Sequence, residues 1–140
     1  MSDPRPEQLA ALRAWLALEH EAVWTYGLLG ARFTSLTAQA REAWTDHRRT
    51  RDALALRVRA AGGSPVRALG AYGVERPKDE RAARSLAVDV EERISAACVA
   101  LVGVGDAAGR RLALTALRST ALRAVDWGAA PDGFPGLSPT

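Results

Sequence analysis

Three ionisable residues have the types and positions to do chemistry together, namely Glu19, His47 and Glu91. Each lies on the apolar stripe of a predicted helix or at the edge of that stripe. Burying a carboxylate is costly unless a cation or a metal ion compensates its charge. The three residues therefore indicate a charged site in the interior of a helical protein.

Glu19 stands in the segment from Ala17 to Gly27, ALEHEAVWTYG, where three ionisable residues are adjacent. The apolar residues around it recur every three or four positions, and Glu19 fills the one gap in that stripe. We therefore expect Glu19 to face inward. We expect His20 and Glu21 to face solvent or a subunit interface, with Glu21 pairing with a neighbouring arginine. The stripe consists of Leu9, Leu12, Leu16, Glu19, Val23, Tyr26, Gly30 and Phe33.

Three interpretations of this interior charge are open. In the first, Glu19 and His47 form a buried pair that fixes helix register, with Arg48 or Arg51 as a counter-charge. In the second, Glu19, His47 and Glu91 hold a single iron or manganese ion. In the third, a small-molecule pocket lies between the helices. The interior polar network that the first interpretation predicts consists of Glu19, Tyr26, His47, Arg48, Arg51 and Glu91.

A complete di-iron site requires a lone glutamate from each of two helices and a Glu-x-x-His pair from each of two others. Trp44, not a glutamate, stands three residues before His47, and Asp126 is the only acidic residue of the segment 110–127. Most of the ligands are therefore missing. We expect a degenerate metal site and no cofactor, with iron or manganese as the alternative.

Four helical segments are expected to position these residues, at about 4–33, 35–61, 77–103 and 106–127. Asp3 can cap the first helix and Pro4 suits its first turn. The third helix opens at Pro77, and Gly62 and Gly63 end the second. The apolar positions of the fourth helix are Leu112, Leu114, Leu117, Ala121, Leu122 and Val125.

The connections predict the topology. Short turns join the first helix to the second and the third to the fourth, so each pair should form an antiparallel hairpin. The crossover, residues 62–76, can extend to about 50 Å, whereas a helix of this length spans about 39 Å. It can therefore make the second and third helices parallel. This predicts one all-α domain over residues 1–140, a ferritin-like four-helix bundle, with a simple up-down-up-down bundle as the alternative.

Two irregular segments flank the second hairpin. The crossover carries Leu69, Tyr72 and Val74, which are expected to pack it onto the bundle. The tail, residues 128–140, is rich in proline and glycine, and Phe134 is expected to pin it.

The composition is that of a globular protein of one domain, with 140 residues, 48% hydrophobic and 25% charged. No apolar run reaches the roughly 18 residues of a membrane span, and no signal segment opens the chain, which favours a cytoplasmic protein without a membrane partner. The single cysteine, Cys98, excludes an internal disulfide and is expected to be buried and unreactive. A net charge of +3 is too small to argue for nucleic-acid binding.

Two surface features point to partners. Trp15, Trp24 and Leu28 fall outside the main stripe of the first helix, which predicts a homodimer interface there. Arginine faces on the second and fourth helices offer contacts to RNA, although no aromatic residues are interleaved for base stacking. These arginines are Arg41, Arg48, Arg59, Arg111 and Arg118.

The motifs ALEHEAVWTYGLLGA, HRRTRD, GAYGV, SLAVDVE and a terminal FPG resemble, in this order and spacing, an actinobacterial ferritin-like domain family of unknown function. The resemblance spans roughly Leu9 to Gly136. It implies a compact, dimeric, ferritin-like four-helix bundle and supplies no activity. Some relatives carry a glutamate where this chain has Ser119, which removes one possible ligand here. The pattern of the family maps onto Glu19, His20, Tyr26, Gly27, His47, Arg48, Asp52, Tyr72 and Glu91.

The sequence therefore predicts a non-catalytic, dimeric binding or scaffold module with a degenerate metal site. The first alternative is a metal-dependent oxidase or hydroxylase that uses Glu19, His47 and Glu91. The second is an RNA- or tRNA-associated protein that binds through its arginine faces. No small-molecule ligand can be named from the sequence.

Overall fold

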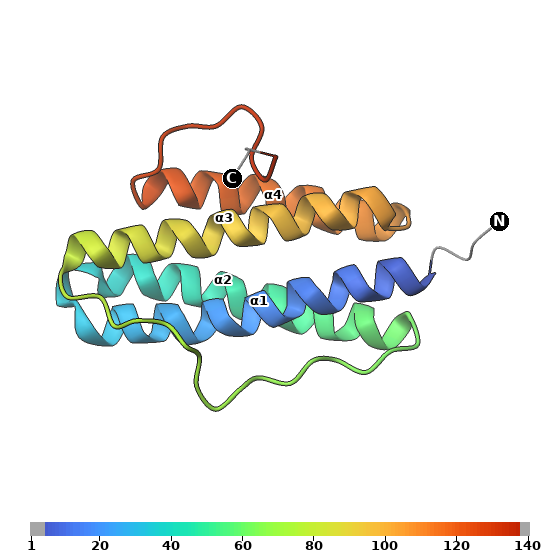
Figure 1. The fold of residues 1–140 in the computed structure, drawn as a ribbon, viewed down its shortest axis with the longest axis horizontal. Coiled ribbons are helices and arrows are strands. Elements are labelled where there is room, and N and C mark those ends of the chain that lie inside the picture. The colour runs from blue at the N-terminus through green and yellow to red at the C-terminus, as the bar shows by residue number, and fades with distance from the viewer. Residues whose placement is uncertain (1–4, 138–140) are drawn as a thin grey trace.

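The computed structural model describes residues 5–137, where the chain forms four α-helices: α1 (Arg5–Arg32), α2 (Thr37–Ala60), α3 (Glu80–Val104) and α4 (Ala107–Asp126). One turn of 3₁₀-helix, η1 (Thr34–Leu36), lies between α1 and α2. No β-strand occurs between residues 5 and 137, so the all-α prediction is confirmed (Figure 1). The expected roles of Asp3 and Pro4 lie outside the described residues.

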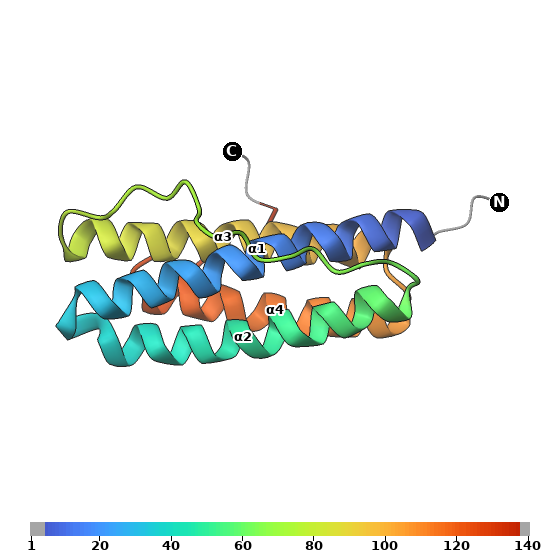
Figure 2. The ribbon, with the colours of Figure 1, turned by 90° about the horizontal axis from the view of Figure 1, so that it is seen from below.

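The helices form two antiparallel hairpins joined by one long crossover. η1 turns the chain from α1 into α2, and Gly105 and Asp106 turn it from α3 into α4. Residues 61–79 run along the bundle from the end of α2 to the start of α3, so that α2 and α3 are parallel (Figure 1 and Figure 2). The predicted topology is confirmed and the up-down-up-down alternative is wrong. α1 packs against both α2 and α3, which gives its side chains access to most of the interior.

Two aspartates determine where the second hairpin begins and turns. The Asp79 carboxylate accepts a hydrogen bond from Ala82 N at 2.8 Å, and α3 begins immediately after it. The start predicted at Pro77 was therefore too early. The helix begins after Asp79, because the Asp79 carboxylate satisfies a backbone N–H of the first turn. α4 begins next to Asp106, close to the predicted start, and Asp106 caps it by accepting a hydrogen bond from Gly109 N at 2.7 Å. No helix within the described range is long and apolar enough to cross a membrane.

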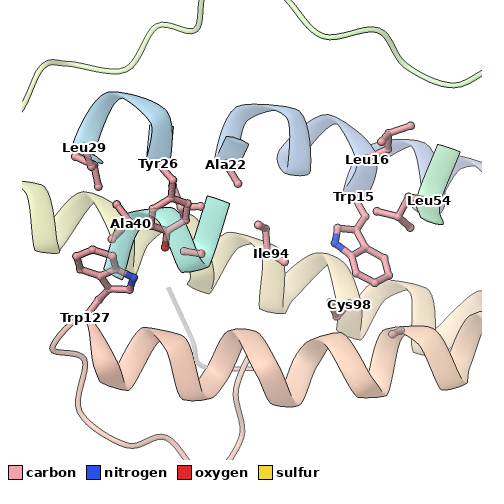
Figure 3. Packing of buried hydrophobic residues seen from close by; sticks show 14 of the residues in the cluster. Trp15, Leu16, Ala22, Tyr26, Leu29, Ala40, Leu54, Ile94, Cys98 and Trp127 are labelled. Atoms are coloured by element: carbon pink, nitrogen blue, oxygen red, sulfur yellow. The ribbon is translucent and has the colours of Figure 1, made fainter. Parts of the chain in front are cut away.

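The core lies between the two hairpins and takes its largest side chains from α1 and from the end of α4. Figure 3 shows Trp15 and Tyr26 projecting from α1 into the interior, on either side of Ile94. Trp127, directly after α4, packs against Tyr26 with 5.7 Å between ring centroids. The interior is therefore aromatic at both ends, and the charged residues lie between these rings.

α4 turns a different face to the core from the one that its leucines predict. Its buried positions are small, with Ala113 and Ala124 among them, whereas Leu114 and Leu122 are 54% and 59% exposed. Of the apolar residues of this helix, Leu114, Leu122 and Val125 are therefore exposed, whereas Leu112 and Leu117 pack against the core. Small side chains let α4 approach α3 closely, and leucines at these positions would hold the helices apart.

The two irregular segments are held by fewer residues than expected. In the crossover, the Tyr72 ring lies 6.0 Å from that of Trp24, but Leu69 is 63% exposed and does not pack onto the bundle. In the tail, Phe134 is 75% exposed, so it does not pin the chain. Gly136 does so instead: its φ is 80°, and a Cβ there would lie 2.6 Å from the carbonyl oxygen of Ser95.

Candidate functional site

The fold brings Glu19 of α1, His47 of α2 and Glu91 of α3 into contact, and all three are buried. Nδ1 of His47 lies 2.6 Å from Oε2 of Glu19, and Nε2 lies 2.8 Å from Oε1 of Glu91. The imidazole ring therefore bridges two carboxylates that enter from opposite sides. We call these three residues and the side chains bonded to them the buried ion network.

Both ring nitrogens of His47 face acceptors, so both must carry a proton for the two hydrogen bonds to form. Burial by itself lowers the pKa of His47, but the charge of Glu19 and the hydrogen bonds to both carboxylates outweigh it and raise the pKa to about 9. His47 is therefore an imidazolium at neutral pH. One buried positive charge stands between two buried negative charges.

Glu91 has the most hydrogen bonds in the network. The Tyr26 hydroxyl donates to its Oε1 at 2.6 Å, and the Thr120 hydroxyl donates to its Oε2. Burial raises the pKa of Glu91, but the hydrogen bond and charge of His47, followed by the charge of Arg123, more than offset burial and lower the pKa below its ordinary value. Burial and the neighbouring Glu91 raise the pKa of Tyr26 well above its ordinary value, so its hydroxyl stays a donor.

Arg123 of α4 supplies the second buried cation, and the sequence analysis missed it. Its Nη1 lies 3.4 Å from Oε2 of Glu91, and its Nη2 donates to Oδ2 of Asp46 at 2.8 Å. Nη1 is also 3.5 Å from Nε2 of His47, but two cations do not bond, and Glu91 holds both of them. The spacing Thr120-x-x-Arg123 was the available signal, because a Glu-x-x-His pair would occupy the same two positions of a helical turn.

Trp15 belongs to this network and not to a surface. It is fully buried, and its indole N–H donates to Oε1 of Glu19 at 2.9 Å. The prediction that Trp15 lies at a subunit interface was therefore wrong. Trp24 and Leu28 are half-buried, and the crossover covers Trp24 through Tyr72. The second apolar face of α1 is explained by the crossover and the core.

Arg48 and Arg51 lie outside the network, which corrects the prediction of a counter-charge from α2. Arg48 is exposed and its guanidinium lies 4.3 Å from the centre of the Trp44 ring. Arg51 pairs with its neighbour Asp52 at 2.8 Å. Both follow His47 on the helix but project away from the interior, so the cation comes from α4.

The residues next to Glu19 contact other parts of the fold. His20 lies 2.9 Å from the carbonyl oxygen of Val66 in the crossover. Glu21 accepts two hydrogen bonds from Arg93 of α3, at 3.0 and 2.9 Å, so the expected arginine partner is present. His20 and Glu21 are both half-buried, and they tie α1 to the crossover and to α3.

Ser119 does not face the network. It is exposed, and its hydroxyl donates to Thr115 O at 3.2 Å. The residue of α4 that reaches Glu91 is the next one along the chain, Thr120. A glutamate at position 119 of this chain would lie in the groove that Thr120 and Arg123 also line, one residue from the position that bonds to Glu91.

The donor set does not fit a metal centre. The two nitrogens of His47 point in opposite directions, each toward a carboxylate, so the three side chains share no common point at which an ion could bind. Across residues 5–137, no group of three or more His, Cys, Asp or Glu side chains is arranged to hold a metal ion. The alternative of a metal held by Glu19, His47 and Glu91 disagrees with this geometry.

A groove of about 270 Å³ between α2 and α4 reaches the network. Glu19, His47 and Arg123 lie along it, together with Arg49 and Asp46 nearer the surface. Cys98 is buried elsewhere in the core, where burial, followed by the charges of Glu19 and Glu91, raises the pKa of its thiol. Cys98 is therefore no nucleophile, in line with the expectation of an unreactive thiol.

Comparisons with known proteins give a family and a similar structure but no activity. The chain is similar to a crystal structure of a conserved hypothetical protein from Mycobacterium tuberculosis, with a TM-score of 0.82 and 29% identity over 87% of this chain and 95% of that chain. No curated protein matches the sequence significantly. Residues 11–139 match the family DUF4439, described as a domain of unknown function. Because this match spans almost the whole sequence, the chain belongs to the DUF4439 family.

Proposed function

We propose that this protein is a non-catalytic binding or scaffold module of ferritin-like descent, which acts as a homodimer and carries an ion network in place of a metal centre. One observation carries the proposal: His47 and Arg123 provide the two positive charges that the buried carboxylates Glu19 and Glu91 require. In a di-metal bundle the metal ions provide that charge. Here the compensation comes from side chains, and Arg123 stands where a histidine ligand would be needed.

Metal analysis of the purified protein tests this proposal. We expect far less than one transition-metal ion per chain, and an unchanged melting temperature when iron, manganese or zinc is added, because ligand binding to the folded state would raise it. The matched variant is Glu19→Ala. About one ion per chain in the natural protein, lost in Glu19→Ala, would show that the network is a metal site and would overturn the proposal.

A double variant tests whether the bundle descends from a protein with a metal site. Thr120→Glu with Arg123→His removes the cation and places a carboxylate and an imidazole beside Glu19, His47 and Glu91. We expect this double variant to gain a metal-dependent rise in melting temperature that the natural protein lacks. A glutamate and a histidine at two exposed positions of α4 outside the groove that reaches the network, Ala108→Glu and Arg111→His, control for the added side chains. Equal behaviour of the two double variants would contradict the proposed descent.

The homodimer is proposed to form through α4. Leu114, Leu122 and Val125 are exposed on the side of α4 opposite its buried positions, with Arg118 midway between the two leucines. When two copies of α4 pack antiparallel about Arg118, Leu114 of one copy meets Leu122 of the other. In this arrangement Arg111 of one copy lies level with Val125 of the other, next to Asp126. Exposed apolar rows of this kind are typical of protein contact surfaces.

The oligomeric state can be measured with a matched pair of variants. Leu122→Asp should weaken dimerisation at least about tenfold in sedimentation experiments, because it places a charge in the apolar stripe. Leu69→Asp, at an equally exposed position of the crossover, should not. In addition, Arg118→Cys should form a disulfide-linked dimer under oxidation. A monomeric natural protein at micromolar concentration would exclude the dimer.

A further inference from the structure

A hollow of about 290 Å³ opens between α1 and α2, away from the groove that reaches the ion network. Tyr26, Gly27 and Gly30 of α1 line one side of it, and Arg41 and Trp44 of α2 line the other. Ala31 and Thr37 complete the lining. Its volume is at the lower end of the range for small-molecule sites.

Gly27 is the residue that leaves this hollow open. Its φ is not positive, so the backbone does not require glycine there. The neighbouring Gly30 is explained by close helix packing, because a Cβ at Gly30 would meet that of Ala40 at 3.4 Å. A Cβ at Gly27 would meet only the indole nitrogen of Trp44, at 4.0 Å. Glycine inside a helix costs about 1 kcal/mol relative to alanine, and at Gly27 neither packing nor conformation accounts for it.

The other side of the hollow is an aromatic wall with a free donor. Trp44 is half-buried, and no residue within 5–137 accepts a hydrogen bond from its indole N–H. This N–H is open to solvent at the hollow, unlike the fully buried indole N–H of Trp127, which has no partner among the described residues. The guanidinium of Arg48 lies 4.3 Å from the ring centre. The guanidinium of Arg48 therefore packs on the Trp44 ring and helps to hold it in place.

The polar groups around the hollow are donors. The guanidinium groups of Arg41 and Arg48 have no ion pair with any residue that the structure describes, in contrast to Arg51, Arg57 and Arg93. Thr37 already donates to Gly30 O at 2.7 Å, and the Tyr26 hydroxyl donates to Glu91. The lining therefore offers two unused donor side chains, Arg41 and Trp44, and one positive charge, and it calls for a ligand that accepts hydrogen bonds.

We infer that this hollow binds a small, flat aromatic carboxylate, with its ring against Trp44 and its carboxylate on Arg41. Aromatic rings stack on an indole face, and guanidinium groups pair with carboxylates through two parallel hydrogen bonds. The inference rests on the proposed binding role and names the class of molecule that is bound. It also gives a use to Gly27, which takes no part in the ion network.

Calorimetric titration with naphthoate tests the inference on the intact protein. We expect saturable binding, weaker by at least about tenfold for uncharged naphthamide and for aliphatic hexanoate, because each lacks one of the two recognition elements. Gly27→Leu, which fills the hollow with a good helix-forming residue, should abolish binding without lowering the melting temperature. Failure to bind naphthoate at millimolar concentration would overturn the inference.

Two arginine variants make the test specific. Arg41→Gln should weaken naphthoate binding at least about tenfold, because it removes a charge-assisted hydrogen bond. Arg59→Gln, at another exposed and unpaired position of α2, should leave binding unchanged. Equal weakening in both variants would show unspecific attraction and would overturn the inference. Metal content is measured separately, so a bound metal ion would overturn the proposed function without deciding whether naphthoate binds.

Discussion

At the scale of single residues, the interior is governed by the cost of burying charge. Glu19 and Glu91 are almost fully buried, and each is in contact with an imidazolium. One imidazolium cannot compensate two carboxylates, so Arg123 reaches in from the groove with a side chain that is only 15% exposed. The network is therefore a single unit, in which the loss of one member leaves the others buried and unpaired.

Removing Arg123 should be far more damaging than removing a surface arginine. Arg123→Met keeps much of the side-chain volume but leaves Glu91 short of a cation, and we expect it to lower the free energy of unfolding by about 3 kcal/mol. Arg51→Met breaks an exposed pair and should cost less than about 0.5 kcal/mol. Urea denaturation of both variants measures the difference. Equal costs would mean that Arg123 does not compensate the buried charge.

At the scale of the elements, hydrogen-bonding side chains at helix ends hold the two hairpins in register. Asp106 caps α4 through Gly109 N, and Arg57 of α2 donates to the same carboxylate at 3.0 Å. The backbone N–H of Asp106 donates a hydrogen bond to the side-chain oxygen of Gln8 in α1. One residue of the second hairpin therefore contacts both helices of the first at this end of the bundle.

Replacing the cap tests this link. Asp106→Ala should lower the free energy of unfolding by about 1–2 kcal/mol, because it loses both the cap and the contact with Arg57. Asp106→Asn retains a capping oxygen and should recover most of that loss. The comparison is made by thermal or urea unfolding. If the asparagine variant were as unstable as the alanine variant, the charge and not the cap would carry the effect.

The tail should be separable from the bundle by one substitution. Gly136 has a φ of 80°, and a side chain there would collide with the backbone of Ser95, whereas a Cβ at Gly133 meets nothing within 4 Å. Gly136→Ala should therefore increase amide hydrogen exchange and proteolysis in residues 128–137 and leave the melting of the helices nearly unchanged. Gly133→Ala is the matched control. Unchanged protection in Gly136→Ala would show that other contacts hold the tail.

At the scale of the whole molecule, the ion network makes stability depend on pH. The pKa of His47 is raised from 6.5 to about 9, so its contribution is complete below pH 6.5 and is lost as the pH rises toward 9. The pKa of Glu91 is lowered from 4.5, so its contribution is complete above pH 4.5 and is lost as the pH falls through its folded-state value. These two groups place maximal stability between about pH 4.5 and 6.5.

The alkaline side of this dependence gives the clearer measurement. The free energy of unfolding should fall by roughly 3 kcal/mol as the pH rises from 6.5 to 9, the equivalent of the shift in the pKa of His47. The fall should persist in His20→Gln, because His20 contacts only a backbone carbonyl, and should disappear in His47→Gln. A flat profile in the natural protein would mean that His47 is neutral between its two carboxylates.

Local pattern was sufficient for the helices, their order and the inward direction of Glu19. These features depend on spacing along the chain: a period close to 3.6 residues, caps and glycines at helix ends, and a crossover long enough to span the bundle. Glu19 could be placed because the stripe of α1 has a single gap. The short turn between α1 and α2 puts Glu19 and His47 within about one helical turn of each other, so their contact was possible from the sequence, and the structure shows that it is made.

Only the tertiary structure decided the partners of these residues, because partners depend on which helix faces lie together. α4 carries leucines on one side and small residues on another, and its sequence did not show that close packing with α3 would bury the small ones. Because α4 buries its small residues against α3, Thr120 and Arg123 face Glu91, and Leu114 and Leu122 are exposed. Trp15 likewise lies in the core, where its ring is fully buried and its N–H donates to Glu19. The spacing of residues within one helix does not show which charged side chain of another helix will lie beside them. Here that side chain is Arg123, and its positive charge makes the site an ion network.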